Sequence, residues 1–323
     1  MTAAGSRLSM AIRDAALEAA TAVSSGPPFE PMALNRPLVV TRSPLKVAVL
    51  NARGGADFHA ILACLSRPPL ADAGTLLLCE ASWRMPRHRW VEFAPGLAEA
   101  LKMSFAFLPS FGRAGDGGEF RAIGNAILCA QPLDGFRAVP LSRPPHLHVP
   151  RRLRGVHQGV LASINVNGRR VTIGVVHLER IWDPEGRERQ MKDFLNAIGR
   201  DAPAIIGGDF NTTTLDMDRR WQLLRACGAI ALRPGRFRRP EPHEPLFDRI
   251  SEHGFSIEGA NVPAVPTFTF SRLVPPRWRP KLDWIAARGI QPIPGSATVV
   301  PARTSIFGRR VSDHDFVLCE FRL

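Results

Sequence analysis

Short apolar runs alternate along the chain with segments that repeat apolar residues at helical spacing. The apolar runs predict strands at 45–50, 75–79, 125–130, 160–166, 171–176, 204–208, 282–287 and 316–321. The helical patterns fall at 57–66, 97–103, 186–199, 215–227 and 244–253. Asn167-Gly168, between two strand-like runs, is typical of a two-residue hairpin turn. A hairpin together with interspersed helices predicts a mixed sheet rather than a purely parallel one.

The first 44 residues have a different pattern. Apolar positions of residues 8–23 share one helical face, which predicts a short amphipathic helix. The sequence Ser24-Ser25-Gly26-Pro27-Pro28 ends that helix, and the residues that follow, to Pro44, are typical of a linker. We therefore expect an N-terminal helix and linker over 1–44 and one domain over 45–323.

Composition narrows the class of protein. The 323 residues are 45% hydrophobic, which is enough for a sizeable core and excludes a disordered chain. No stretch approaches the roughly 18 consecutive apolar residues of a spanning helix. The net charge is +13, and only four of the 42 basic residues are lysine. Such an excess is typical of polyanionic partners, nucleic acid or an anionic membrane surface, although codon bias also enriches arginine.

The five cysteines lie far apart and form no C-x-x-C pair. This pattern favours a reducing compartment and argues against structural zinc. Arg13, Asp14 and Glu18 interrupt the first apolar stretch, so it does not have the form of a secretory signal. From these features we expect a cytoplasmic protein.

Polar residues stand where several predicted strands end or begin. They are Asn51, Glu80, His177, Asp209, Asn211, Asp283, Asp313 and His314. Asp209 and Asn211 are two residues apart, so an extended backbone directs both to one side. Each residue alone is also compatible with a turn or an exposed surface. Six segments that all carry such a residue predict a chemical site at one edge of a sheet, where strands hold side chains rigidly.

These residues resemble a known family. Asn51, Glu80, His177, GGDFN at 207–211, LDWI at 282–285 and SDH at 312–314 are similar, in order and spacing, to the endonuclease/exonuclease/phosphatase superfamily. That superfamily includes DNase I-like nucleases, abasic-site endonucleases, neutral sphingomyelinases and inositol phosphatases. The resemblance covers roughly residues 45–323. It implies an α/β (α+β) fold: two mixed β-sheets packed face to face with helices outside, a four-layer αββα sandwich.

The resemblance also implies hydrolysis of phosphoester bonds with Mg²⁺ or Mn²⁺. Glu80 and Asp313 are then the carboxylate ligands of the metal, which prefers oxygen donors. Asn51 adds an amide oxygen or orients a metal-bound water.

The remaining roles concern protons and phosphate oxygens. His314 is implied as general base or phosphate-polarising group, with Asp283 on its other ring nitrogen. Asp209 orients or activates the attacking water, and Asn211 contacts a phosphoryl oxygen. His177 donates to the phosphate or to the leaving group. The sequence leaves open whether Asp209 or His314 takes the proton.

The chain departs from its relatives beside these residues. Cys79 stands where glutamine is common, Trp284 follows the orienting aspartate in place of Tyr or His, and Asp315-Phe316 replaces Arg-Pro. None of these positions is a predicted catalytic residue, so we expect an active enzyme whose substrate is open.

Three stretches without acidic residues carry much of the positive charge: 137–158, 233–239 and 272–281. Their proline content predicts exposed loops, which form either a basic rim around the site or ordinary solvated loops. Phe237 and Trp278 lie among the arginines and are suited to stack on bases or to enter a lipid interface.

We therefore expect a monomeric phosphodiesterase with a phosphate-ester substrate, foremost a nuclease acting on DNA or RNA. The alternatives are a sphingomyelinase-like phospholipid phosphodiesterase, a small-molecule phosphatase, and a non-catalytic nucleic-acid-binding module. A membrane surface is a less favoured partner, because the 8–23 helix lacks a face enriched in basic residues.

Overall fold

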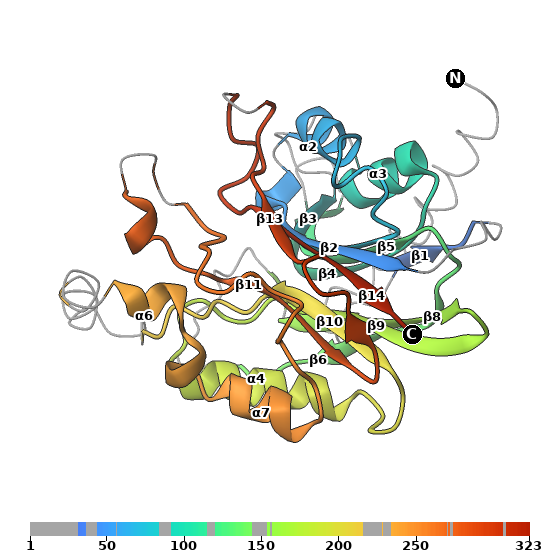
Figure 1. Cartoon of the computed structure of the whole chain (residues 1–323). Coiled ribbons are helices and arrows are strands. Elements are labelled where there is room, and N and C mark those ends of the chain that lie inside the picture. Colours follow the sequence, from blue (N-terminus) through green and yellow to red (C-terminus); the bar gives the residue numbers. More distant parts are fainter. Residues whose placement is uncertain are drawn as a thin grey trace.

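Two β-sheets pack against each other and carry helices on their outer faces (Figure 1). The structure, a computed structural model, describes residues 32–36, 44–55, 57–83, 92–114, 120–143, 154–155, 157–215, 228, 234–269, 271, 274–305 and 308–323. The predicted arrangement of two mixed sheets in a layered sandwich is confirmed.

The larger sheet has nine strands. Its main order is β1 (Met32–Leu34), β4 (Ser104–Ala114), β5 (Phe120–Cys129), β3 (Thr75–Trp83), β2 (Leu45–Asn51), β14 (Phe316–Arg322) and β12 (Gln291–Pro292). Two short strands pair at its sides, β7 (Arg154–Gly155) with β4 and β13 (Thr298–Val300) with β14. β2 is parallel to β3 and antiparallel to β14, so the sheet is mixed.

The smaller sheet has five strands. Their order is β11 (Asp283–Arg288), β10 (Ala204–Asp209), β9 (Arg169–Val175), β8 (Gln158–Val166) and β6 (Asp134–Pro140). β9 and β10 are parallel, and the other pairs are antiparallel. Asn167 and Gly168 join β8 to β9 with positive φ angles of 53° and 80°, as the predicted hairpin turn requires.

Helices cover both outer faces (Figure 1). The larger sheet carries α2 (Phe58–Leu65) and α3 (Phe93–Leu101), and the smaller sheet carries α4 (Pro184–Asn196) and α7 (Leu246–Glu252). The shorter elements are α6 (Gly235–Arg238) and the 3₁₀ turns η2 (Arg53–Gly55), η4 (Glu241–His243) and η5 (Pro276–Trp278). None of the helices in the described ranges has the length and apolar character needed to cross a membrane.

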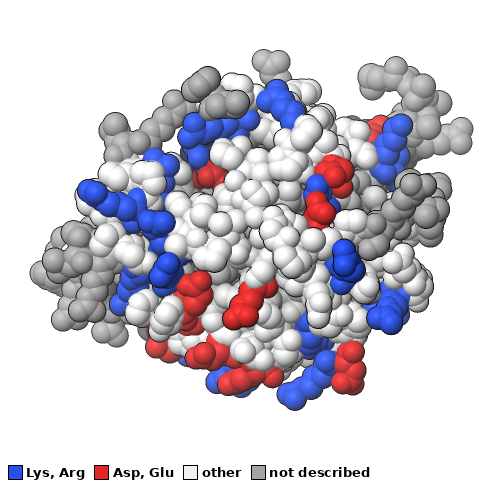
Figure 2. Space-filling model, viewed as in Figure 1, with Lys and Arg blue, Asp and Glu red and all other residues white. Residues whose placement is uncertain are grey.

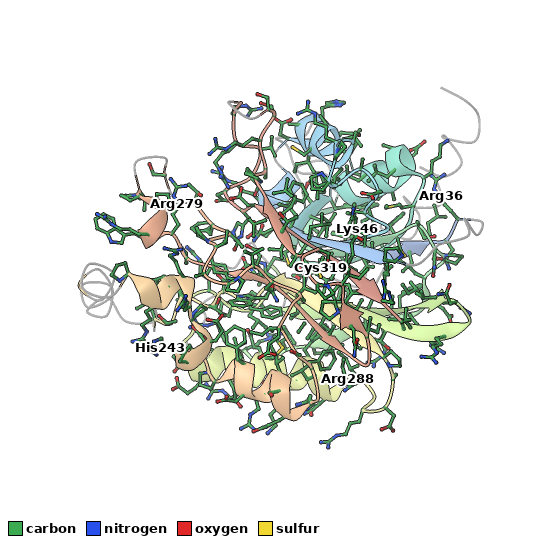
Figure 3. The ribbon with its side chains drawn as sticks, in the orientation of Figure 1. Arg36, Lys46, His243, Arg279, Arg288 and Cys319 are labelled. Atoms are coloured by element: carbon green, nitrogen blue, oxygen red, sulfur yellow. The ribbon has the colours of Figure 1, made fainter. Side chains whose placement is uncertain are left out.

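Alternation along the strands produces three apolar layers. In β2, Val47 and Val49 belong to the cluster between the sheets, whereas Ala48 and Leu50 belong to the cluster under α2 and α3. A third cluster packs the outer face of the smaller sheet against α4 and α7. Cys319, labelled in Figure 3, lies in the layer between the sheets. The two sheets are therefore fixed relative to each other by a continuous buried core.

All eight predicted strands are present, but two long ones were not predicted. β4 contains Pro109, which the sheet accommodates at a register shift between Pro109 and Phe111, and a proline normally argues against a strand. β6 lies at the edge of its sheet and exposes most of its residues, so it lacks an apolar pattern. Strand β1 lies within the predicted linker. The predicted helix 8–23 and all but the first residue of the predicted helix 215–227 lie outside the described residues.

The basic stretches are more ordered than predicted. Residues 137–140 belong to β6, and residues 235–238 form α6, so neither segment is a loop. Arg151, Arg152, Arg233 and Arg272 lie outside the described residues.

Lys281 contradicts the predicted exposed rim. It is 1% exposed, its Nζ donates to the Val262 carbonyl at 2.9 Å, and it lies 3.8 Å from the centre of the Trp284 ring. Burial lowers the pKa of Lys281 to about 8. In the unfolded chain the pKa of Lys281 has its ordinary value near 10.5. Below pH 8 the lysine is protonated in both states, and burying its charge lowers the free energy of unfolding.

We expect Lys281→Met to stabilise the protein near pH 7, by up to about 3 kcal/mol. The advantage should shrink as pH rises from about 8 to about 10.5, because the wild-type lysine loses its proton in that window. Urea unfolding of both proteins across this range measures the difference. If the difference in free energy of unfolding between the two proteins does not depend on pH, the lowered pKa of Lys281 is wrong.

Candidate active site

The predicted polar residues of the larger sheet lie at one edge. Asn51 ends β2, and Glu80 lies in β3 just after Cys79, the last residue that pairs with the parallel strand β2. β14 runs antiparallel to β2, so Asp313 and His314, which precede it, reach the same edge. The Ser312 hydroxyl donates to the Asn51 carbonyl at 2.7 Å and accepts from the His314 backbone N–H, which ties the two segments together.

The smaller sheet delivers a second set. His177 lies two residues after strand β9, and Asp209 ends β10, which is parallel to β9. Asp283 begins β11 and pairs with Asp209 in the register of β10 and β11. Gly208 makes this approach possible, because a Cβ there would lie 1.9 Å from the Val176 carbonyl oxygen. No other residue fits that position.

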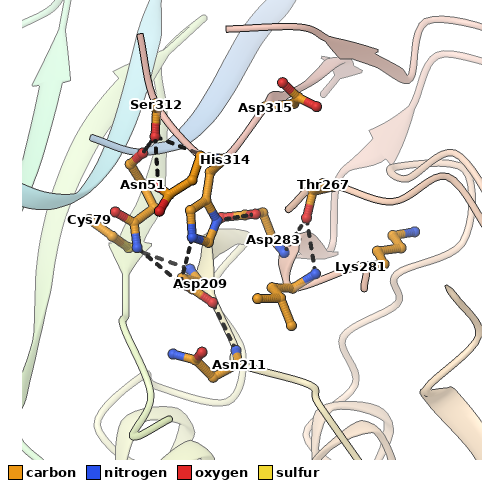
Figure 4. A network of polar contacts seen from close by, with 12 residues as sticks. Asn51, Cys79, Asp209, Asn211, Thr267, Lys281, Asp283, Ser312, His314 and Asp315 are labelled. Carbon is orange, nitrogen blue, oxygen red and sulfur yellow. Dashed lines mark hydrogen bonds and ion pairs between the residues drawn. The ribbon is translucent and has the colours of Figure 1, made fainter. Parts of the chain in front are cut away.

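A buried imidazole–carboxylate pair joins the two sheets (Figure 4). His314 Nδ1 lies 2.8 Å from Asp283 Oδ2, and their side chains are 6% and 0% exposed. The Asp283 backbone N–H donates to the Thr267 hydroxyl, and the Phe268 ring packs 4.7 Å from the His314 ring. With Nδ1 held in this way, the other ring nitrogen of His314 faces Asp209 at 3.7 Å.

Asp209 lies at the centre of the site. Its Oδ1 accepts from the Asn211 backbone N–H at 2.9 Å, and its Oδ2 accepts from Asn51 Nδ2 at 3.0 Å across the two sheets. The same Oδ2 is 3.6 Å from His177 Nε2. Asn211 donates to the Leu178 carbonyl through Nδ2, which has a second hydrogen to donate. One carboxylate therefore stands between two imidazoles.

Charge in this buried site shifts both members of the pair. Burial alone would lower the pKa of His314, but the nearby Asp283 and Asp209 carboxylates outweigh it and raise the pKa to about 10. Burial raises the pKa of Asp283, although the His314 charge opposes the shift. The nearby carboxylates thus favour the protonated form of His314.

Glu80, Asp313 and Asn51 offer the hard oxygen donors that Mg²⁺ or Mn²⁺ prefers. Glu80 is partly buried, and the Asp313 side chain is 30% exposed and 3.6 Å from Arg53 Nε. Asn51 faces the cluster with its nitrogen, which donates to Glu80 and Asp209, while its oxygen accepts from the Arg53 N–H. The Glu80 and Asp313 carboxylates are of the type that holds such a metal, and Asn51 orients Glu80 by donating to it.

A second group also has the spacing of a metal site. The ligand atoms of Asp209, Asp283 and His314 lie within 4.8 Å of one another. Both nitrogens of His314, however, already face carboxylates.

Cys79 packs against the backbone of Asp209. It is 0% exposed, and its Sγ accepts from the Asp209 backbone N–H at 3.4 Å. Burial raises the pKa of the Cys79 thiol well above its ordinary value. The residue in which this chain departs from its relatives therefore acts as a neutral contact that holds the end of β10.

His157 and Glu179 were not predicted as site residues. Their side chains meet at 2.6 Å, and the His157 ring lies 6.3 Å from the His177 ring, edge to face. The predicted hairpin could have indicated this pair. His157 precedes β8 and Glu179 follows β9, and the antiparallel pairing brings these two strand ends together. Burial would raise the pKa of Glu179, but the hydrogen bond and charge of His157 prevail and lower it to about 2.

Comparisons with known proteins concern the family and the fold of the chain. A profile described as the Endonuclease/Exonuclease/phosphatase family matches residues 48–314. An endonuclease/exonuclease/phosphatase structure from Beutenbergia cavernae is similar, with 18% identity, a TM-score of 0.59, and coverage of 87% of this chain and 72% of that one. A sequence comparison with curated proteins finds no match.

Two further solved structures are also similar in fold. The human Nocturnin catalytic domain with bound sulfate shares 18% identity over 90% of this chain and 96% of that one, with a TM-score of 0.51. D. rerio TDP2 complexed with single strand DNA product shares 16% over 87% of this chain and 100% of that one, with a TM-score of 0.52. At these identities the likeness shows a common fold.

We expect Glu179→Gln to destabilise the protein near pH 7 by up to about 3 kcal/mol. The folded-state pKa lies below the unfolded value of 4.5, so this stabilisation exists above pH 4.5 and is lost as pH falls toward 2. Chemical unfolding of both proteins between about pH 6 and pH 3 tests this. Glu185→Gln, on the exposed face of α4, is the control, and an equal loss in that variant would refute the assignment.

Proposed function

We propose that this chain, which belongs to the endonuclease/exonuclease/phosphatase family, hydrolyses phosphodiester bonds with the help of a divalent metal ion. The observation that supports the proposal is the buried His314–Asp283 pair, which directs the second imidazole nitrogen at Asp209. Family membership makes hydrolysis of phosphoester bonds the expected chemistry, and the arrangement of these three side chains supplies groups suited to it.

Proton transfer in this proposal begins at Asp209. Its carboxylate orients the attacking water and accepts its proton, as a positioned general base does. His314, held as a cation by Asp283, donates through Nε2 to a phosphoryl oxygen. His177 and Asn211 donate to the remaining phosphate oxygens or to the leaving group, since the His177 ring and the Asn211 backbone both lie beside Asp209. Donors fixed before the reaction lower the barrier because they need no reorganisation.

The metal is assigned to the carboxylates of Glu80 and Asp313. When bound, Mg²⁺ or Mn²⁺ would offset negative charge on the phosphoryl oxygens and on the leaving oxygen. Asn51 keeps the Glu80 and Asp209 carboxylates in place by donating to both. The two carboxylates then have separate roles, because Glu80 binds the metal and Asp209 orients the attacking water.

Nucleic acid is the substrate class that we favour. The net charge of +13 suits a polyanion, because such charge raises the local concentration of anionic substrates. Among proteins of the same fold, TDP2 was crystallised with a single-stranded DNA product. A phospholipid or a small phosphate ester remains the competing substrate.

We expect Asp209→Asn and His314→Ala each to reduce kcat by about 10²–10⁴ with Mg²⁺ present, because each removes a proton-transferring or charge-stabilising group. Hydrolysis of duplex DNA, single-stranded DNA, RNA, sphingomyelin and phosphoinositides, with EDTA controls, measures the effect. Asp134→Asn and His253→Ala, both far from the site, are matched controls. Full activity in both site variants, with their melting temperatures retained, would refute the assignment.

We also expect Mg²⁺ or Mn²⁺ to raise the melting temperature, since a ligand that binds only the folded state stabilises it. The shift should be lost in Glu80→Gln and in Asp313→Asn and retained in Glu99→Gln, an exposed change on α3. This readout does not depend on activity. A shift that survives in both ligand variants but disappears in Asp283→Asn would assign the metal to Asp209, Asp283 and His314 instead.

A further inference from the structure

Two basic segments that are distant in the sequence meet beside the site. α6 and the residue after it carry Arg236, Arg238 and Arg239, and η5 with the residue after it carries Arg277 and Arg279. The two segments contact each other, and the Phe237 carbonyl accepts from the Lys281 N–H just beyond η5. We call these five arginines the basic ridge. Figure 2 shows basic side chains gathered on the side of the molecule where Figure 1 places α6, and Figure 3 labels Arg279 there.

The ridge is attached to both strand ends that form the site. On one side, Arg236 donates to the carbonyl of Thr214, three residues after Asn211. On the other side, the chain runs from η5 through Lys281 to Asp283. The Thr212 hydroxyl donates to the Lys281 carbonyl at 2.7 Å, which links the two connections. The position of the ridge relative to the site is therefore set by hydrogen bonds.

The distance to the site is also limited by the chain itself. Arg277 is six residues from Asp283, so the two are separated by at most about 20 Å. Phosphates of one strand of a duplex follow each other every ~3.4 Å along the axis. The ridge is thus within about six nucleotides of a phosphate bound at the site.

The ridge has the chemistry of a phosphate-binding surface. Residues 234–239 and 274–281 contain no acidic residue. Arg239 and Arg277 are exposed, and the Arg277 guanidinium lies 5.0 Å from the centre of the Trp278 ring. Guanidinium groups bind phosphate through two parallel hydrogen bonds and stack on aromatic rings.

A membrane is a poorer match for this surface than a nucleic acid. Interfacial binding requires an exposed apolar face beside the basic one. Among the described residues, the large exposed hydrophobic side chains are Phe136 and Ile181, and neither belongs to the ridge. A small phosphate ester has no second phosphate with which to contact the ridge while the first is bound at the site.

We propose that the basic ridge binds backbone phosphates of the nucleic-acid strand next to the cleaved bond, so that the enzyme prefers polynucleotides to small phosphodiesters. This inference rests on the proposed function and adds the location of the strand. Strands that are too short to contact the site and the ridge together gain nothing from the ridge.

The test uses Arg239→Gln/Arg277→Gln in the full chain with Mg²⁺. The matched control is Arg169→Gln/Arg170→Gln, which removes the same charge from β9 at the hairpin end, opposite the site. Substrates are a single strand of about 20 nucleotides, a strand of about four, and bis(p-nitrophenyl) phosphate. We expect kcat/KM for the long strand to fall at least about tenfold and its salt slope to shrink by about 1.4, the value for two phosphate contacts. The short substrates and the control variant should be unaffected.

A separate binding measurement distinguishes the two proposals. Anisotropy of the labelled long strand, in the Asp209→Asn background, reports the ridge whether or not hydrolysis is found. Equal affinity and salt slope with and without the ridge arginines would overturn the inference while leaving the hydrolysis proposal intact. Wild-type protein that binds the long strand but hydrolyses no phosphodiester would overturn the proposed function instead. If the arginine changes weaken binding to phosphatidylserine vesicles and not to the strand, the ridge is a membrane surface and the inference is wrong.

Discussion

The buried contact between His314 and Asp283 is the interaction on which the site depends, because it joins two sheets that have no hydrogen-bonded strand in common. His314 precedes β14 of the larger sheet, and Asp283 begins β11 of the smaller one. A buried imidazole and a buried carboxylate are each unfavourable without a partner. Pairing them stabilises both and also determines which nitrogen of His314 faces Asp209. Structure and chemistry therefore depend on one hydrogen bond, and the apolar layer between the sheets holds its two sides in place.

The backbone is unusual at two residues of the edge that carries the site. Glu80 and Asn211 adopt positive φ angles of 51° and 50°, which residues other than glycine rarely do, and Glu80 lies where the register of β3 and β5 shifts. Such conformations persist only where the surroundings support them. Here the Cys79 thiol and the Leu178 carbonyl provide contacts to Asp209 and Asn211. The strand ends are irregular where side chains must turn toward a common point.

Charge is divided between the interior and the surface. Acidic groups gather around His314 in the buried site, whereas arginines gather on the outside over α6 and η5 (Figure 2). Lys281 lies between the two regions, and burial removes it from the surface. The net charge by itself did not distinguish these environments. Their separation allows an acidic centre to sit beside a surface that attracts anions.

Several features could be predicted from the sequence alone. Apolar periodicity located eight of the strands, including every strand with a long buried run and no interrupting proline, and the Asn167-Gly168 turn was predicted from two residues. The polar residues at the strand ends, with their order, indicated the family and the fold. These features depend on neighbours in the chain, and a sequence records such neighbours directly. It follows that the fold class required no tertiary information.

Other features were decided by tertiary structure. The His157–Glu179 pair, the burial of Lys281 and the meeting of α6 with η5 involve residues that are far apart in the chain or whose exposure depends on distant segments. The direction of the Asn51 amide depends on the Arg53 N–H and on two carboxylates from other strands. Periodicity specifies which face of a strand a side chain occupies, but not which atom it meets across a packed interface. That choice is made by the packing of the two sheets.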